Sequence, residues 1–85
     1  RSRGLGDVYK RQALSDDDQI AELTLPTDWA DKTIVELNIR RNFGVSVLGI
    51  HRGGKFLTSP GAETMLMAGD VLLVMGKKEA ISAVQ

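Results

Sequence analysis

The glycine pair Gly53-Gly54 constrains the fold of this chain more strongly than any other feature. It separates two segments rich in β-branched and apolar residues, Val45–Arg52 and Lys55–Thr58. A two-residue hairpin loop of type I′ requires positive φ at both positions, and glycine adopts positive φ at little steric cost. The sequence therefore predicts an antiparallel hairpin over residues 45–58.

Two further segments have the pattern of strands. Residues 21–25 alternate apolar and polar side chains, as in a half-buried strand, and Pro26 then removes a ladder donor. Residues 71–75 follow a Gly-Asp turn and are apolar on both faces, like residues 45–50. Strands that are apolar on both faces need cover on both sides. We therefore expect an α+β fold: a small antiparallel β-sheet with two flanking helices.

Helical patterns lie before and after the strands. Residues 31–40 predict one helix that ends before Gly44, and a second helix begins at Lys77. Three side chains ahead of the first helix are suited to capping it: Thr27, Asp28 and Asp31.

The apolar side chains of the first helix cover two of its sides. Ile34 and Leu37 lie on one side, and Val35 and Ile39 lie on another. Together they span about 200°, which is wider than the apolar stripe that a surface helix of a monomer needs. We expect one side to pack on the sheet of the same chain and the Val35 side to pack on a second copy.

Composition excludes several classes of function. The chain has 85 residues, with 11 basic and 11 acidic side chains, and this balance argues against nucleic-acid binding. It has no cysteine and a single histidine, so it lacks the ligands of a zinc site and a placed nucleophile–base pair for catalysis. No apolar run approaches the ~20 residues of a membrane span. We expect a cytoplasmic, non-enzymatic domain that holds no metal and does not insert into the membrane.

The small size of the domain also bears on its assembly. A core this small supplies little stability by itself, which favours burial against a partner subunit.

Residues 1–18 differ in composition from the rest of the chain. Residues 1–12 are basic and glycine-containing and show no helical or strand period, so we interpret them as a leader that is non-native at least in part. A natural linker between domains is the alternative. The acidic run at residues 16–18 is expected to be solvated rather than to bind a metal. The folded domain is expected to comprise residues 19–85.

Two blocks at matching separation resemble the RCK_C (TrkA C-terminal) domain. The first is Lys32-Thr33 … Glu36-Leu37 … Arg40, and the second is Gly69-Asp70 … Gly76. The resemblance extends over nearly all of the chain after the leader. One departure is Asp31, where the family commonly has glycine. Asp tolerates left-handed backbone better than most residues, so we expect the fold to survive this change.

The resemblance implies a dimerising regulatory domain of bacterial potassium uptake systems of the Trk and Ktr type. In some relatives the dimer cleft holds cyclic di-AMP, which would place Ile34 and Ile39 in an apolar wall, Arg40 on a phosphate and Pro60 in a loop contact. Each of these has a structural alternative. The two isoleucines suit a core or dimer contact, Arg40 suits an ion pair with Glu36 four positions earlier, and Pro60 suits a turn.

The resemblance also implies a Rossmann-like domain ahead of this one. No Gly-x-Gly-x-x-Gly fingerprint occurs in the sequence, so a NAD or ATP site, and the contact with a membrane transporter subunit, would lie on that other domain. No cofactor is expected in this chain. Two functions remain open. One is a ligand-sensing domain that gates potassium transport through dimer rearrangement. The other is a ligand-free dimerisation domain of a cation/proton antiporter or permease.

Overall fold

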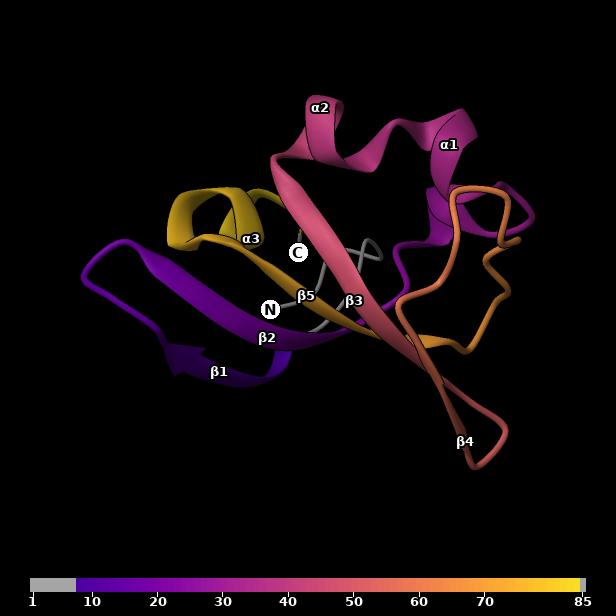
Figure 1. Cartoon of the computed structure of the whole chain (residues 1–85), viewed down its shortest axis with the longest axis horizontal. Coiled ribbons are helices and arrows are strands. Elements are labelled where there is room, and N and C mark those ends of the chain that lie inside the picture. Colours follow the sequence, from indigo (N-terminus) through magenta and orange to yellow (C-terminus); the bar gives the residue numbers. More distant parts are fainter. Residues whose placement is uncertain (1–7, 85) are drawn as a thin grey trace.

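The computed structural model describes residues 8–84, which form one five-stranded antiparallel sheet with helices (Figure 1). The strand order is β1-β2-β5-β3-β4, so the central strand is the one nearest the C-terminus. The strands are β1 (Val8–Ala13), β2 (Asp18–Thr24), β3 (Val45–Arg52), β4 (Lys55–Thr58) and β5 (Val71–Lys77). The helices are the 3₁₀ turn η1 (Thr27–Trp29), α1 (Ile34–Leu37), α2 (Ile39–Phe43) and α3 (Lys78–Val84). The α+β class is confirmed.

The predicted hairpin is present. β3 and β4 pair in antiparallel register from Arg52↔Lys55 to Gly49↔Thr58. Gly53 and Gly54 have φ of 56° and 81°, both in the left-handed region that a type I′ loop demands. The hairpin is therefore closed at the two positions where the sequence placed its glycines.

The prediction of a single helix over residues 31–40 is wrong. Asn38 has φ of 48° and separates α1 from α2, and its N–H donates to the carbonyls of Ile34 and Val35. Asparagine tolerates this left-handed conformation, which explains why the break falls at Asn38. The cap was also misassigned. Thr33 caps α1 by accepting from the N–H of Glu36, whose carboxylate accepts from the N–H of Thr33.

Asp31 behaves as expected for a residue in a glycine position. Its φ is 66°, and its N–H donates to the carbonyl of Leu66. Aspartate therefore adopts, at this position, a left-handed backbone of the kind that glycine adopts most easily.

Residues 8–12, interpreted from the sequence as part of a leader outside the folded domain, take part in the sheet. They belong to β1, which pairs with β2 from Val8↔Leu23 to Ala13↔Gln19. The guanidinium of Arg11 also donates to the hydroxyl of Ser82 in α3. A strand ladder is made of backbone hydrogen bonds, so β1 pairs without an alternating side-chain pattern of its own. Residues 1–7 lie outside the described part of the chain.

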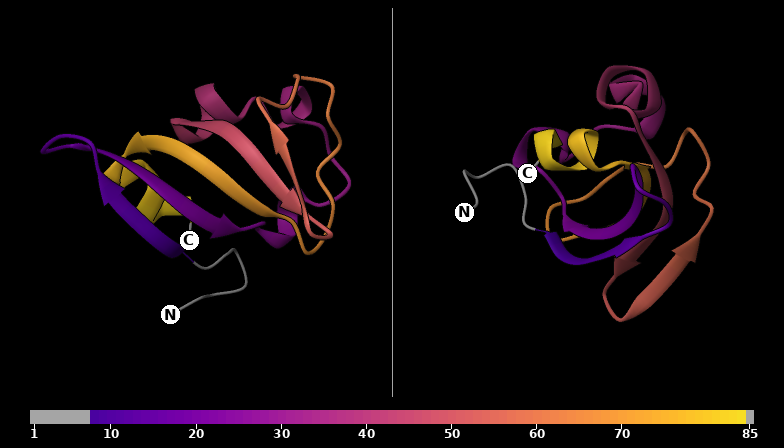
Figure 2. Two further views of the ribbon diagram at one scale, coloured as in Figure 1. Left: turned by 60° about the horizontal axis from the view of Figure 1, so that its bottom comes forward. Right: turned by 90° about the vertical axis from the view of Figure 1, so that its left-hand side faces the viewer.

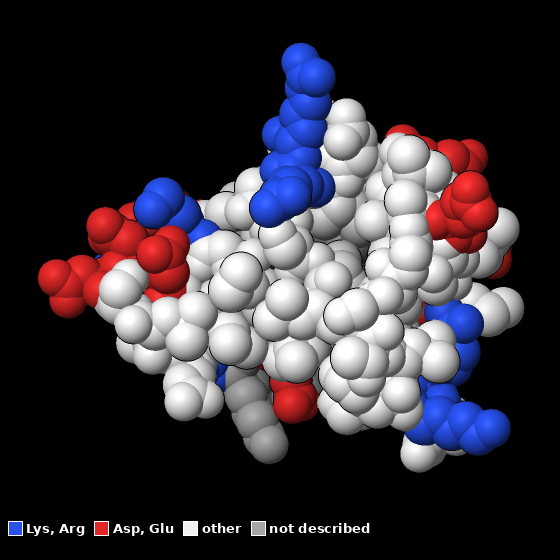
Figure 3. Space-filling model, viewed as in Figure 1, with Lys and Arg blue, Asp and Glu red and all other residues white. Residues whose placement is uncertain are grey.

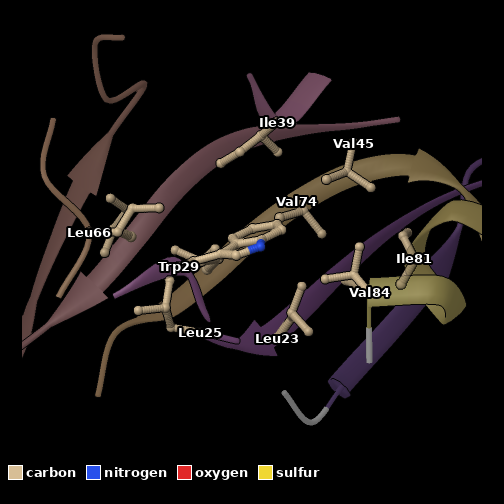
Figure 4. Close-up of a cluster of buried hydrophobic side chains, with 12 residues drawn as sticks. Leu23, Leu25, Trp29, Ile39, Val45, Leu66, Val74, Ile81 and Val84 are labelled. Carbon is tan, nitrogen blue, oxygen red and sulfur yellow. The ribbon is translucent and has the colours of Figure 1, made fainter. Parts of the chain in front are cut away.

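The hydrophobic core lies between the sheet and the helices. The sheet curls, and α3 lies over β2 and β5 on its concave side, while α2 packs on β3 (Figure 2). The buried residues come from every layer (Figure 4): Ala21, Leu23, Leu25, Trp29, Ile39, Val45, Ile50, Leu66, Leu72, Val74, Ile81 and Val84. The predicted second helix is thus confirmed as the cover of the central strands.

Candidate functional site

The loop between β4 and β5 lies along α1 and brings two of the predicted site residues to one side of the molecule. At one end, the N–H of Ser59 donates to the carbonyl of Leu48 at 2.8 Å. Further along, the N–H of Val35 donates to Ala62 at 2.8 Å, and that of Ile34 donates to Thr64 at 3.2 Å. Pro60 therefore lies in the chain between a residue bonded to β3 and a residue bonded to the start of α1.

A buried ion pair anchors the other end of this loop. The Arg52 guanidinium donates from Nε to Oδ1 of Asp70 at 2.9 Å and from Nη2 to Oδ2 at 2.7 Å. The N–H of Met67 donates to Oδ2 at 2.9 Å, and Arg52 Nη2 also donates to the carbonyl of Met65 at 2.8 Å. Asp70 is 1% exposed. We call this group the Arg52–Asp70 clip.

The electrostatics of the clip favour the ionised carboxylate. Burial alone raises the pKa of the Asp70 carboxyl, but the hydrogen bonds from Arg52 and Met67 and the charge of Arg52 outweigh it. The pKa of Asp70 therefore lies below its ordinary value. The hydrogen bond to Asp70 correspondingly raises the pKa of Arg52. The clip is a fixed charge pair at neutral pH.

The two isoleucines of the predicted apolar wall have different surroundings. Ile39 is 2% exposed and belongs to the core, whereas Ile34 is half-buried and packs against that core. Val35 is 58% exposed. The left-handed break at Asn38 rotates α2 relative to α1, so Val35 and Ile39 do not share an exposed side. The side expected to pack on a second copy was Val35 with Ile39. Of these two residues, only Val35 is exposed.

Arg40 lines a different surface. It is exposed on α2 and borders a groove of about 430 Å³ whose wall includes Ser46, Met75 and Lys77. Basic side chains project over α2 at the top of Figure 3, and the face below them carries few charges. Pro60 and Ile34 do not line this groove. The expected ion pair with Glu36 does not form, because the carboxylate of Glu36 completes the cap with Thr33.

The groove can hold an anionic group. The guanidinium of Arg40 presents a planar fork that suits a phosphate, and Ser46 adds a hydroxyl beside the apolar Met75. Lys77 is partly engaged, since its Nζ lies 3.4 Å from Oδ1 of Asp18. Among residues 8–84, no group of three or more His, Asp or Glu side chains is arranged to hold a metal ion. No helix in this range is long and apolar enough to cross a membrane.

Sequence reasoning missed the clip. The sequence places Asp70 in a turn and Arg52 at the end of a strand, and neither position by itself predicts that the two side chains pair. A signal was present, because a charged residue directly flanks each of two strands that are apolar on both faces. Such residues lie where the sheet ends, and His51↔Val71 pairing brings them together. The ion pair can be recognised only once it is known that β3 pairs with β5.

Comparison with known proteins identifies the family. The model of the TrkA-C domain matches residues 20–85. The chain is a member of the TrkA-C domain family. The RCK_C resemblance stated above is thereby confirmed, and the matched segment begins in β2 and extends through α3.

Relatives of this chain include a potassium uptake protein and an uncharacterized transporter. It is 35% identical over 68 residues to Ktr system potassium uptake protein A of Bacillus subtilis, covering 80% of this chain and 31% of that protein. It is 40% identical over 57 residues to an uncharacterized transporter of Bacteroides thetaiotaomicron, covering 67% of this chain and 10% of the transporter. The chain thus spans about a third of the length of the first relative and a tenth of the second.

A solved structure matches over most of both chains. It is the RCK C domain of the potassium transport protein KtrA in complex with cyclic diadenosine monophosphate (c-di-AMP). The TM-score is 0.74 and the identity is 31%, with 82% of each chain covered. The agreement extends to the α+β architecture predicted from the sequence.

Proposed function

We propose that this chain is the cytoplasmic ligand-sensing domain of a bacterial potassium transport system and that it binds c-di-AMP as a homodimer. The observation that supports this most strongly is the match to a KtrA RCK C domain solved with that ligand, over 82% of both chains. The Arg40 groove supplies a cation suited to the phosphate of such a ligand.

A second copy follows from where the proposed contacts lie. Arg40 lines its groove without Ile34 or Pro60, which lie beside the loop and α1. A ligand that contacts Arg40 as well as Ile34 and Pro60 therefore needs a second copy of the chain, which supplies one side of the binding site. Ile39 is 2% exposed, so it supports the ligand site by packing in the core beneath α2 and does not touch the ligand itself.

Signalling in this proposal works by population shift. A ligand that bridges two copies stabilises one arrangement of the dimer in proportion to its differential affinity for that arrangement. The bias then passes through a preceding nucleotide-binding domain to the membrane subunit, at the inner face of the membrane. This chain contributes no catalytic step.

Calorimetric titration with c-di-AMP tests the proposal. We expect Arg40→Ala to weaken binding by about 1.5–3 kcal/mol, the range for hydrogen bonds to charged groups. Arg41→Ala is the matched control, because Arg41 is the adjacent exposed cation and does not line the groove. Arg40→Lys should recover only part of the loss, since an ammonium cannot form a bidentate pair. Wild-type affinity in Arg40→Ala, or no heat with c-di-AMP at about 100 μM where a micromolar site would be saturated, would exclude this site.

One alternative is favoured by a specific relative. The 40% identity to a Bacteroides transporter is higher than the identity to the Ktr protein, though over fewer residues. It favours attachment to a transporter of another kind, and the alternative we propose on that ground is a ligand-free dimerisation domain of a cation/proton antiporter or permease. This function predicts dimers in light scattering together with no binding of c-di-AMP or of another cyclic dinucleotide.

A further inference from the structure

A second cavity shares no lining residue with the Arg40 groove. It is a cleft of about 330 Å³ between η1, α1, α2 and the end of α3. Its walls are mostly apolar, and two charged side chains reach it. We call it the Trp29 cleft. Its lining includes Trp29, Leu37, Phe43, Val84, Asp28 and Lys32.

Trp29 offers an unused hydrogen-bond donor in this cleft. The residue is 3% exposed, and its ring centroid lies 4.9 Å from that of Phe43. Its indole N–H has no acceptor within residues 8–84, and the nitrogen lies on the side of the ring that faces Val84 across the cleft (Figure 4). The nitrogen is not among the buried polar atoms that lack a partner, so it keeps some exposure to solvent. An occupant with an acceptor atom would take the place of water at this donor.

The charged residues of the cleft are one anion and one cation. Asp28 and Lys32 are both exposed, and neither side chain forms an ion pair or hydrogen bond with another described residue. A phosphate ligand does not suit this arrangement, because one lysine would have to balance its charge beside a carboxylate. A molecule that carries both signs is complementary to the pair.

We propose that the Trp29 cleft binds a small zwitterion with an aromatic side group, the chemistry of an aromatic amino acid. The carboxylate accepts from the Trp29 N–H and pairs with Lys32, while the ammonium pairs with Asp28. The ring packs between Phe43 and Leu37. The cleft has the size and the apolar lining with few polar groups that are typical of small-molecule sites. This site is separate from the Arg40 groove and does not depend on c-di-AMP binding.

The indole of Trp29 reports directly on the site, because the chain contains one tryptophan. Its side-chain N–H gives a single indole signal in a ¹H–¹⁵N spectrum. The 85-residue chain is titrated with L-phenylalanine, phenylacetate and phenethylamine to about 10 mM, which detects Kd values of about 1 mM. Phenylalanine is expected to shift the indole proton downfield and to bind more tightly than either singly charged analogue.

Charge variants decide whether both rim residues take part. Lys32→Ala should weaken phenylalanine binding about two- to five-fold, since exposed ion pairs are weak, and should reduce its advantage over phenethylamine to what the Trp29 N–H alone provides. Asp28→Ala should weaken it similarly and abolish the advantage over phenylacetate. Lys55→Ala, a lysine beside the hairpin loop, is the matched control and should bind like wild type.

Three results would overturn the proposal. The first is an indole signal that phenylalanine does not move. The second is equal affinity for all three probes with no effect of Lys32→Ala or Asp28→Ala, which would identify an apolar cleft without charge recognition. The third is an indole signal that shifts with protein concentration and is insensitive to the probes, which would identify the cleft as a contact between copies of this chain.

Discussion

Replacing Asp70 by asparagine tests the clip that fixes the loop after β4. The substitution keeps the shape of the side chain but removes its charge, and its amide nitrogen cannot accept from Arg52. Asp70 accepts three hydrogen bonds, two from Arg52 and one from Met67. An asparagine oxygen placed at the position of Oδ2 could retain the bond from Met67 and one from Arg52. The loss therefore includes at least the Nε–Oδ1 bond and the charge pair.

The size of the stability loss depends on how deeply Asp70 and Arg52 are each buried. A hydrogen bond to a charged group contributes about 1.5–3 kcal/mol, and breaking a fully buried pair costs about 3–5 kcal/mol. The Arg52 side chain is 32% exposed, so water can rehydrate it and the cost falls toward the lower range. We expect Asp70→Asn to lower the free energy of unfolding by about 2–3 kcal/mol. For a domain of this size, that corresponds to a fall in Tm of about 10–20 °C.

The pH dependence of the free energy of unfolding shows whether the charge of Asp70 stabilises the fold. The pKa of Asp70 is lower in the folded state, so the unfolded chain binds more protons between the folded and unfolded pKa values. The stabilisation is present above the unfolded pKa of about 3.9 and is lost as the pH falls through the folded pKa. The difference between wild type and Asp70→Asn should therefore stay constant from about pH 5 to 8 and shrink below about pH 4.

Urea unfolding followed by Trp29 fluorescence, at one protein concentration, measures both quantities. Asp28→Asn is the matched control, because Asp28 is exposed and makes no ion pair within residues 8–84, and it should change stability by less than about 0.5 kcal/mol. The reasoning is refuted if Asp70→Asn costs no more than this control, or if the difference remains constant down to pH 3.

Three further predictions concern packing, the first strand and assembly. Gly49→Ala would bring a Cβ into collision with the ring of Phe56, so it should destabilise the protein by about 1–3 kcal/mol, and Phe56→Ala in the same chain should restore most of that loss in thermal melts. Deleting residues 1–13 should lower the Tm by more than about 5 °C, or roughly 1 kcal/mol, because it unpairs the edge of β2; an unchanged Tm would show that β1 adds no stability. Val35→Glu should leave the monomer folded, since Val35 is 58% exposed, but should give monomers in light scattering if Val35 lies in the dimer contact.

Local chemistry was sufficient to predict the hairpin and the strands. Gly53 and Gly54 specify one loop geometry, and the apolar runs on either side can satisfy it only by pairing with each other. Gly44 has the left-handed φ of 75° that its position after the helix predicted. These features depend on residues that lie within a few positions of one another.

The misassigned elements depend on competition between local and distant partners. The capping box of Thr33 and Glu36 sets the start of α1, and the helical pattern over residues 31–40 is broken at Asn38, which accepts a left-handed backbone. β1 forms because the edge of β2 presents unpaired backbone groups, and periodicity of side chains cannot reveal that. The Arg52–Asp70 clip likewise required knowledge of which strands are adjacent.

The clip also connects the stability of the domain with the placement of its candidate ligand residues. The loop that carries Pro60 is attached at Ser59 to β3 and at Met65 and Met67 to the clip, and between these points it pairs with the start of α1. Asp70→Asn weakens the second attachment, because the Nε–Oδ1 bond and the charge pair are lost, and it leaves the first in place. Asp70→Asn should therefore disturb the surface beside Ile34 and Pro60 and leave the Arg40 groove unchanged, because that groove is lined by none of the residues of the clip or the loop. Amide hydrogen exchange locates the effect: faster exchange at Ile34, Val35 and Leu66, with unchanged exchange at Gly44, would establish that the clip positions the loop rather than stabilising the whole fold uniformly.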